Sequence, residues 1–254
     1  MKVVSLQSGS NGNCVYVASG DTSILVDAGI SGVRAADRLA SFGIDIRSVT
    51  AVVITHDHAD HIAFAGVYRR KFALPVYVSD RTYEAAKIRH KLGRIKGLVK
   101  FHSGDSLRIG GLSILTIPTP HDAVDGVAIA VEDGRRRLGV LTDLGHVFAE
   151  LPDIISSLDG VLLESNYDPE MLEKGPYPEV LRQRIRGPGG HLSNAEAAEL
   201  LRSSGRRLSW ACLAHLSAEN NTPEIALETH RRVLPDSLPL LTASRYAPVE
   251  MLEL

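Results

Sequence analysis

Short apolar runs separated by amphipathic stretches are the main pattern along this chain. Nine short runs are rich in Val, Ile, Leu and Ala, which is the pattern of β-strands. The expected strands are residues 15–18, 23–28, 49–55, 75–79, 112–117, 127–131, 137–142, 160–164 and 209–214. Helical patterns lie between them, so the order of elements predicts a mixed α/β protein.

Capping residues indicate where four of the helices begin. The expected helices are one from Ser31 to Phe42 with Gly43 behind it, one that Asp80 caps and Gly93 ends, one at 195–204 opened by the Ser193–Glu196 capping box, and one at 224–233 opened by Thr222 and Pro223. These helices separate the predicted strands, as layered α/β folds require.

A weak internal repeat indicates how the sheets are arranged. The segment LVDAG at 25–29 resembles LTDLG at 141–145, and each is followed by a helix and then an apolar strand. Two related β–α–β units predict two sheets packed face to face with helices outside. The 254 residues contain no low-complexity segment or Pro/Gly-rich linker, so we expect a single domain over residues 1–254.

The segment THDHADH at 55–61 carries the densest group of metal-type side chains. His56 and His58 alternate and can point to one side of an extended loop, whereas Asp60 and His61 lie on the following turn. Neutral imidazole and carboxylate suit zinc, manganese or iron. Four ligands on so short a loop cannot all close on one ion in good geometry. Two ions are therefore expected.

Three later residues complete the ligand set. His121, Asp143 and His215 each end an apolar run, and the carboxyl ends of strands are where sites assemble in layered α/β proteins. We assign metal one to His56, His58 and His121, metal two to Asp60, His61 and His215, and the bridging position to Asp143. Asp27 is expected to orient the ligand loop from behind. A lone histidine is more often structural, and His90, His102, His146 and His230 are read in that way.

These residues, in this order, resemble the HxHxDH signature and later ligands of the metallo-β-lactamase superfamily. The resemblance implies a four-layer αββα sandwich with a dinuclear site at one edge of the sheets. True metallo-β-lactamases usually have Arg after the Asp of this motif and a Cys ligand later. Neither Cys14 nor Cys212 stands at a matching position, which argues against antibiotic hydrolysis.

Further segments resemble one branch of that superfamily, the YycJ/WalJ type. They are SGSNGNCVYV at the start, HDAVDG after His121, GGHLSNAEAAELL, and LAHLSAENNTPEIA. Members of the branch are regarded as cytoplasmic metal-dependent DNA exonucleases that work in the 5′-to-3′ direction. GGHLSN also resembles a segment of tRNase Z, where the histidine is read as a proton donor held by a glutamate. The resemblance implies these roles for His191 and Glu164.

The residues of GGHLSN support a phosphate site independently. Gly189 and Gly190 permit close backbone approach, and Ser193 starts a helix whose free N–H groups favour an anion. The candidate catalytic residues are Asp60, His191 and Glu164, and the candidate phosphate-binding residues are Ser10, Asn11, Asn13, Ser193 and Asn194. The alternative is that Ser193 only caps its helix and that the segment 10–13 is a tight turn.

Charge is spread unevenly along the chain. Residues 69–100 hold ten Lys/Arg and two Asp/Glu, a net charge of +8 in a chain of formal net charge −2. Such a block suggests an anionic polymer as partner, and its alternative reading is a solvated helix face. No apolar run approaches a membrane span, the start lacks a signal-peptide core, and the two cysteines form no CxxC. We expect a cytoplasmic protein with no membrane partner.

The combined expectation is a phosphodiesterase with two divalent ions, Zn²⁺ or Mn²⁺, that hydrolyses nucleic acid. A 5′-to-3′ DNA exonuclease is the favoured form. The alternatives are a phosphodiesterase for a cyclic or dinucleotide substrate, a thioester or lactone hydrolase of the glyoxalase II kind, and a non-catalytic binding module. The sequence leaves the metal and the oligomeric state open.

Overall fold

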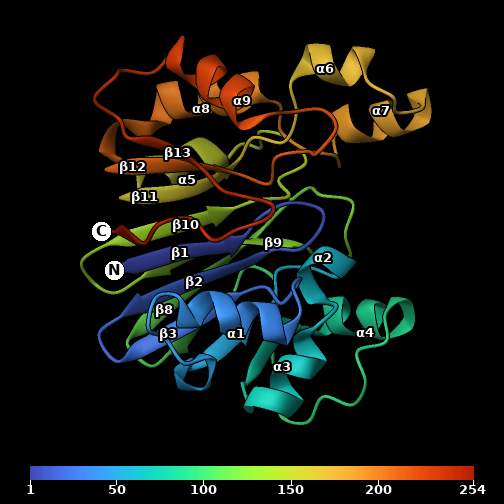
Figure 1. Cartoon of the computed structure of the whole chain (residues 1–254), viewed down its shortest axis with the longest axis vertical. Coiled ribbons are helices and arrows are strands. Elements are labelled where there is room, and N and C mark those ends of the chain that lie inside the picture. The colour runs from blue at the N-terminus through green and yellow to red at the C-terminus, as the bar shows by residue number, and fades with distance from the viewer.

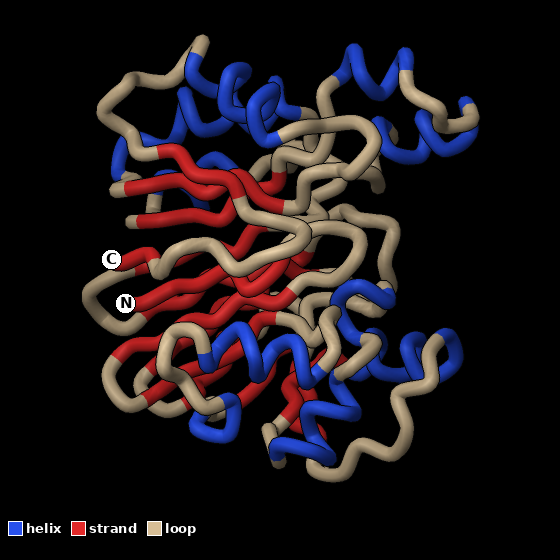
Figure 2. Tube along the Cα trace, in the orientation of Figure 1, coloured by secondary structure: helices blue, strands red, loops and turns tan.

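Two seven-stranded sheets pack face to face, and helices cover both outer faces (Figures 1 and 2). The computed structural model describes residues 1–254. The first sheet has the strand order β14-β1-β2-β3-β4-β5-β6 and the second has the order β13-β12-β11-β10-β9-β8-β7. The predicted αββα sandwich is confirmed. None of the helices combines the length and apolar character needed to cross a bilayer.

The strands are short and belong to two sheets that combine parallel and antiparallel pairs. The strands of the first sheet are β1 (Lys2–Gln7), β2 (Cys14–Ser19), β3 (Thr22–Val26), β4 (Ala51–Val53), β5 (Val76–Ser79), β6 (Leu98–Phe101) and β14 (Leu252–Glu253). Those of the second are β7 (Ser106–Ile109), β8 (Leu112–Pro118), β9 (Val127–Glu132), β10 (Arg137–Leu141), β11 (Gly160–Glu164), β12 (Trp210–Ala214) and β13 (Leu240–Thr242).

Nine α-helices and two short 3-10 helices connect the strands. They are α1 (Gly32–Ala40), η1 (Ile46–Ser48), α2 (Ala59–Ile62), α3 (Ala65–Phe72), α4 (Asp80–Arg89), α5 (Leu151–Ser156), α6 (Pro169–Lys174), α7 (Glu179–Arg186), α8 (Asn194–Ser204), η2 (Gly205–Arg207) and α9 (Pro223–Arg231). Helices α1 and α3 lie on the side of the first sheet, and α5, α8 and α9 lie on the side of the second (Figure 1).

The apolar runs are continuous because the central strands are buried on both faces. In β3, Ile24 and Val26 join the core between the two sheets, whereas Leu25 packs with Leu39 of α1 and Tyr68 of α3. Side chains alternate across a strand, so one run supplies two hydrophobic layers. A third cluster lies between the second sheet and its helices. Three apolar interfaces thus separate four layers.

The predicted elements are present, with differences at their ends. All nine expected strands form, and the capping box at Ser193 and the Thr222 cap are both observed. The cap of α4 is Ser79 rather than Asp80, and the helix ends at Arg89, four residues before Gly93. The sequence analysis missed β1, β6, β7, β13 and β14. Most of these strands are short or mix charged with apolar residues, so their local pattern is weak.

Candidate metal centre

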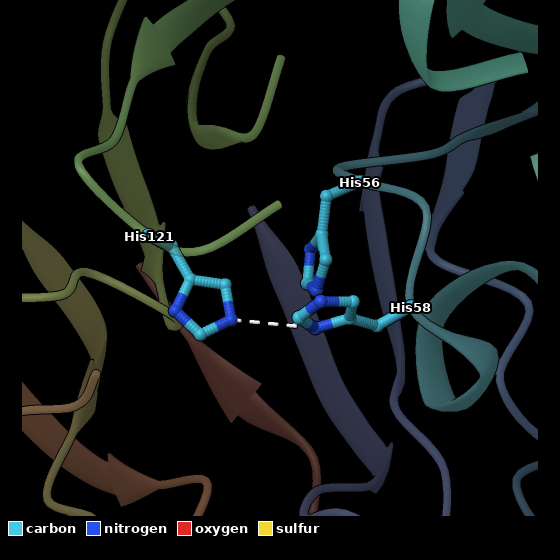
Figure 3. Close-up of side chains that lie close together, drawn as sticks. All are labelled: His56, His58 and His121. Carbon is cyan, nitrogen blue, oxygen red and sulfur yellow. Dashed lines mark hydrogen bonds between the residues drawn. The ribbon is translucent and has the colours of Figure 1, made fainter. Parts of the chain in front are cut away.

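The residues predicted for metal one lie together at the carboxyl ends of the strands. His56 follows β4, His58 directly precedes α2, and His121 follows β8 of the other sheet. Each offers a ring nitrogen, and the three nitrogens lie within 4.8 Å of one another. Figure 3 shows His121 facing His58 and His56 across the site, with 3.4 Å between His121 Nε2 and His58 Nδ1.

The residues predicted for metal two form a second group beside the first. Asp60 and His61 belong to α2, and His215 directly follows β12. Asp60 Oδ2 lies 3.4 Å from His61 Nε2 and 3.6 Å from His215 Nε2. Both ligand groups assigned from the sequence are therefore brought together by the fold.

Asp143 contacts both groups. Its Oδ2 lies 3.3 Å from His61 Nε2, and its Oδ1 lies 3.7 Å from His121 Nε2 and 3.5 Å from His215 Nδ1. One carboxylate between two ligand groups has the position that a bridging ligand requires.

Several buried atoms at this centre lack a hydrogen-bond partner. They are His56 Nε2, His215 Nε2 and Asp143 Oδ2. An uncompensated buried polar atom costs about 1–3 kcal/mol, so three of them in one place need a common explanation. Imidazole nitrogen and carboxylate oxygen are the ligands that divalent transition metals accept. The donor set fits divalent cations.

Contacts from behind fix the orientation of the ligand rings. His61 Nδ1 lies 2.7 Å from Asp27 Oδ2, as expected for Asp27, and the Thr55 N–H donates to Asp27 Oδ1 at 2.8 Å. His121 Nδ1 lies 2.9 Å from the carbonyl oxygen of Gly190. In both rings Nδ1 is engaged in this way, and Nε2 faces the other metal-type residues, with His61 Nε2 3.4 Å from Asp60 Oδ2. A Cβ on Gly190 would lie 2.0 Å from the Ile185 carbonyl oxygen, so this position requires glycine.

The backbone is strained where the ligands leave the strands. Asp27, Asp143 and His215 have φ of +68°, +58° and +56°. The left-handed region costs a non-glycine residue roughly 1–2 kcal/mol, and such conformations concentrate at functional sites. Asp27 and Asp143 hold the same position in the internal repeat, LVDAG and LTDLG. The two β–α–β units therefore turn their chains toward the site in the same way.

Burial and charge set the protonation of the metal-type residues. Burial, together with the neighbouring histidines, holds the pKa of His56 well below its ordinary value and lowers that of His58, which favours the neutral rings that metals bind. Burial alone would raise the pKa of Asp60, but His61 and His215 outweigh it and hold that pKa well below its usual range. Burial opposes protonation of His61, but Asp143, Asp27 and Asp60 outweigh it and raise that pKa.

The partly buried His191 pairs with the buried Glu164 next to the metal-type residues. Glu164, the last residue of β11, is fully buried, and its Oε1 lies 2.7 Å from His191 Nδ1. Its Oε2 accepts the N–H groups of Leu144 and Leu192. Burial would raise the pKa of Glu164, but the charge and hydrogen bond of His191 outweigh it and hold that pKa below its ordinary value.

His191 also lies close enough to Asp143 and His215 to be a metal ligand itself. Its ring, Asp143, Glu164 and His215 each offer one atom, and these atoms lie within 4.8 Å of one another. The contact between His191 Nδ1 and Glu164 leaves Nε2 as the free ring nitrogen, and His191 lines the cavity. The position suits either an acid or a ligand, and the two roles differ in their consequences for metal content.

A cavity of about 430 Å³ opens onto this centre. Among the predicted site residues it is lined by Ser10, His58, Asp60, His121, Asp143, His191 and His215. The cavity is also lined by residues that no sequence pattern predicted for the site: Arg89, His90, Asn166, Tyr177, Leu181, Arg184, Ile185 and Ser217. Arg184 belongs to a short basic run, Arg182, Arg184 and Arg186, which favours a nucleic-acid substrate, but nothing local to Tyr177 or Leu181 indicated a role.

Four of the five predicted phosphate-binding side chains do not face the cavity. Asn13 is buried and its Nδ2 lies 2.9 Å from His61 Nε2, and Ser193 is engaged in the capping box with Glu196. Asn194 is fully buried and accepts a hydrogen bond from Ser165. Asn11 donates to the Arg245 carbonyl oxygen. These side chains hold the loops of the site, and Ser10 alone of the five lines the cavity.

Asp57 and His90 support the ligand loop through contacts of their own. The Asp57 side chain is fully buried, pairs with Arg89, and accepts the Val124 N–H at 2.8 Å. His90, read from the sequence as structural, lies with its Nε2 2.7 Å from the Asp57 carbonyl oxygen. Together they connect the end of α4 to the ligand loop.

Comparison with known proteins agrees with this geometry. Residues 8–153 match the Metallo-beta-lactamase superfamily. The chain is 36% identical over 224 residues to exodeoxyribonuclease WalJ of Streptococcus pneumoniae serotype 2, covering 87% of this chain and 83% of that protein. It is 34% identical over 237 residues to exodeoxyribonuclease YycJ of Bacillus anthracis, covering 91% and 88%. The crystal structure of the metallo-β-lactamase fold protein YhfI from Bacillus subtilis has a TM-score of 0.74 at 20% identity, over 98% of this chain and 99% of that one.

Fold, ligand set and sequence similarity all point to metal-dependent hydrolases. The chain belongs to the metallo-β-lactamase superfamily and, within it, to the WalJ/YycJ-type branch.

Proposed function

We propose that this enzyme is a phosphodiesterase with two divalent metal ions that degrades DNA from the 5′ end. The whole chain, residues 1–254, acts as one domain in this proposal. Zn²⁺ and Mn²⁺ are the candidate ions, since both accept imidazole and carboxylate ligands. The WalJ and YycJ relatives are named exodeoxyribonucleases, which supports the reaction class. The buried free thiols of Cys14 and Cys212 support a reducing, cytoplasmic location.

The observation that carries the proposal is the His191–Glu164 pair beside the two ligand groups. Phosphodiester cleavage expels a sugar alkoxide, which needs a proton as it leaves. Glu164 Oε1 engages His191 Nδ1 at 2.7 Å and leaves Nε2 as the proton-donating atom. Thioester hydrolysis expels a thiolate, which has much less need of that acid. The pair therefore favours phosphodiester over thioester chemistry.

Each part of the site has a distinct task in this reaction. The ligand groups would hold the ions through His56, His58 and His121, and through Asp60, His61 and His215, with Asp143 between them. When bound, the ions supply positive charge against the phosphate oxygens and acidify water to a hydrolytic nucleophile. His191 gives a proton from Nε2 to the departing sugar oxygen. Glu164 keeps the ring in place, and the N–H groups of Leu144 and Leu192 hold Glu164.

Part of the basic block supports a polymeric substrate. Arg89, Lys87 and Lys100 pair with acids, and Arg69 and Arg70 bond to backbone carbonyl groups. Lys91, Arg94 and Lys96 are exposed in the segment after α4 and have no carboxylate partner. Arg89 and His90 line the cavity, and the chain leads from them through Lys91 to Arg94 and Lys96, whose carbonyl groups accept hydrogen bonds from Arg70 and Arg69 of α3. Phosphate contacts of this kind dominate nucleic-acid affinity.

End-labelled DNA tests the proposal. Metal-free protein supplied with Mn²⁺ or Zn²⁺ should release labelled mononucleotide at once from a 5′-labelled strand. From a 3′-labelled strand it should give a series of progressively shorter products. The opposite labelling pattern would reverse the polarity, and cleavage of circular DNA would show an endonuclease.

A small phosphodiester is the alternative substrate, because the cavity of about 430 Å³ admits one. An enzyme for a small diester should bind with little dependence on salt, whereas a DNA enzyme loses affinity steeply as salt rises. Efficient hydrolysis of a cyclic or dinucleotide diester without degradation of DNA would favour this alternative.

A further inference from the structure

The cavity has an apolar wall that the metal chemistry does not use. Tyr177, Leu181 and Ile185 line it, at intervals of four residues along the segment that leads into and through α7. Leu181 and Ile185 lie four residues apart and so on one face of α7, and Tyr177, just before the helix N-cap Pro178, lines the same cavity. Helix α7 contributes no fully buried residue, and this face meets the cavity instead of a core.

Tyr177 is held in a defined position. It lies between Pro176 and Pro178, and proline restricts both its own backbone and that of the residue before it. The ring is half-buried, and its hydroxyl makes no hydrogen bond within the protein. An aromatic ring on a cavity wall, carried by a restricted backbone, is a surface on which another flat ring can stack.

Two arginines line the same cavity, and most of their guanidinium N–H donors make no hydrogen bond within the protein. Arg184 Nε donates to Asp122 Oδ2 at 2.6 Å, and Arg89 pairs with the buried Asp57. Their side chains remain 59% and 49% exposed, and a guanidinium has five N–H donors, of which each uses one here. Helices α7 and α4 lie on either side of the edge of the sheets that carries the site (Figure 1). The guanidinium groups are thus anchored and free to bind an anion.

We infer that this cavity binds one nucleoside monophosphate unit of the substrate, with its base against Tyr177, Leu181 and Ile185 and its phosphate at Arg184. This subsite rests on the proposed function, because it seats a nucleotide beside the bond to be cleaved. The apolar wall with its aromatic ring matches the base of such a unit and the guanidinium matches its phosphate, whereas a lone phosphate would leave the wall uncovered.

Equilibrium binding to the metal-loaded enzyme tests the subsite. The probes are thymidine 5′-monophosphate and 2-deoxyribose 5-phosphate, which differ only in the base. The wild-type protein should bind the first roughly 5- to 150-fold more tightly, the usual range for stacking of one base. Tyr177→Ala should bring this ratio close to one without changing affinity for the sugar phosphate, and Tyr177→Phe should keep it.

Arginine variants test the phosphate contact separately. Arg184→Gln should weaken both probes about tenfold and leave their ratio unchanged, since a charged contact to phosphate is lost. The matched controls lie on the same helix: Val180→Ala, an 80% exposed residue, and Arg186→Gln, which pairs with Glu173 and Glu179 away from the cavity. Both should bind as the wild type does.

The inference is overturned if the wild type binds the two probes equally, or if Tyr177→Ala leaves the ratio unchanged. It also fails if Val180→Ala lowers the ratio as much as Tyr177→Ala. Binding of thymidine 5′-monophosphate requires no cleavage. Base-dependent binding without DNA degradation would therefore reject the proposed function alone, and degradation without base-dependent binding would reject the subsite alone.

Discussion

At the scale of single residues, the site depends on a few side chains that contact more than one partner. Asp143 touches both ligand groups, and Glu164 joins His191 to the backbone of two loops. Removing such a residue should affect several functions together, whereas removing His191 should affect one. Substitutions at these two positions therefore separate metal binding from proton transfer.

Asp143→Ala should abolish activity and lower metal content below that of the wild type. Without the carboxylate, two cations would lie close together with less negative charge between them. Elemental analysis of the purified variant measures the loss, with the exposed Asp153→Ala as a control that keeps full metal content. Full occupancy of two metals with normal turnover would reject the bridging role.

His191→Ala should keep both metals and bind DNA almost normally, while its rate on DNA falls by roughly 10²–10⁴, the usual contribution of a positioned general acid. A nitrophenolate is stable as an anion and needs no proton. The variant should therefore retain much more of its activity on bis-nitrophenyl phosphate. Rates on both substrates and metal content are the measurements, and His102→Ala, at an exposed position away from the cavity, is the control.

The alternative roles of His191 give different results. If His191 is a metal ligand, activity on both substrates should fall together and metal content should drop. If it is only a residue beside a helix cap, neither rate should change much.

At the scale of elements, loops and helix ends are held by buried polar groups that do not touch substrate. The capping box of α8 fixes the turn that carries His191, and Asn221 bonds to Asn194 beneath it. Helix α9 packs on the same layer and carries His230, which is fully buried with its Nδ1 2.8 Å from the Ala226 carbonyl oxygen. Such a buried histidine makes the stability of this layer depend on pH.

Burial lowers the pKa of His230 from 6.5 to about 4. As pH falls from 6.5 toward 4, the unfolded chain takes up a proton that the folded chain does not, so stability is lost in that window. Between about pH 7 and about pH 5 this proton uptake lowers the free energy of unfolding by about 2 kcal/mol. Urea unfolding of metal-free protein measures the free energy of unfolding at each pH. Between pH 7 and pH 5 this free energy should fall by about 2 kcal/mol less in His230→Gln than in the wild type. An equal dependence in both proteins would show that His230 does not titrate in this way.

At the scale of the whole molecule, charge is arranged around the site edge. The unpaired Lys91, Arg94 and Lys96 follow α4, whereas Lys2 and Arg135 lie at the far ends of the strands. The N- and C-termini also lie on the side away from the site (Figure 1). The exposed basic side chains after α4, together with Arg89 at the cavity, favour approach of a polyanion from that side.

Reversing charge at Lys91, Arg94 and Lys96 to Glu should reduce DNA cleavage far more than cleavage of bis-nitrophenyl phosphate. The salt dependence of DNA binding should also become less steep, because fewer phosphates are neutralised. The matched control changes Lys2, Arg135 and Arg206 to Glu, which alters net charge equally at exposed positions outside the cavity. Equal loss on both substrates, or equal loss in the control, would contradict a DNA-binding role for this surface.

The sequence by itself determined the layered fold and the ligand groups, because local patterns of residues specify both. Apolar runs of strand length predict buried strands, and the THDHADH cluster with three strand-terminal residues predicts a centre that the fold does bring together. The pairing of His191 with Glu164 was implied by the resemblance of GGHLSN to a segment of tRNase Z, and the two side chains are in contact. The strands that were missed are mostly short, or carry polar residues that weaken the pattern.

Only the tertiary structure decided which polar side chains reach the cavity. Asn13, Ser193 and Asn194 have the residue types of a phosphate site, yet they are buried, and their side chains contact His61, Glu196 and Ser165. Tyr177 and Arg89 face the cavity although they lie 88 residues apart in the sequence. Such convergence depends on how two sheets and their helices pack, which the order of residues within one element cannot specify.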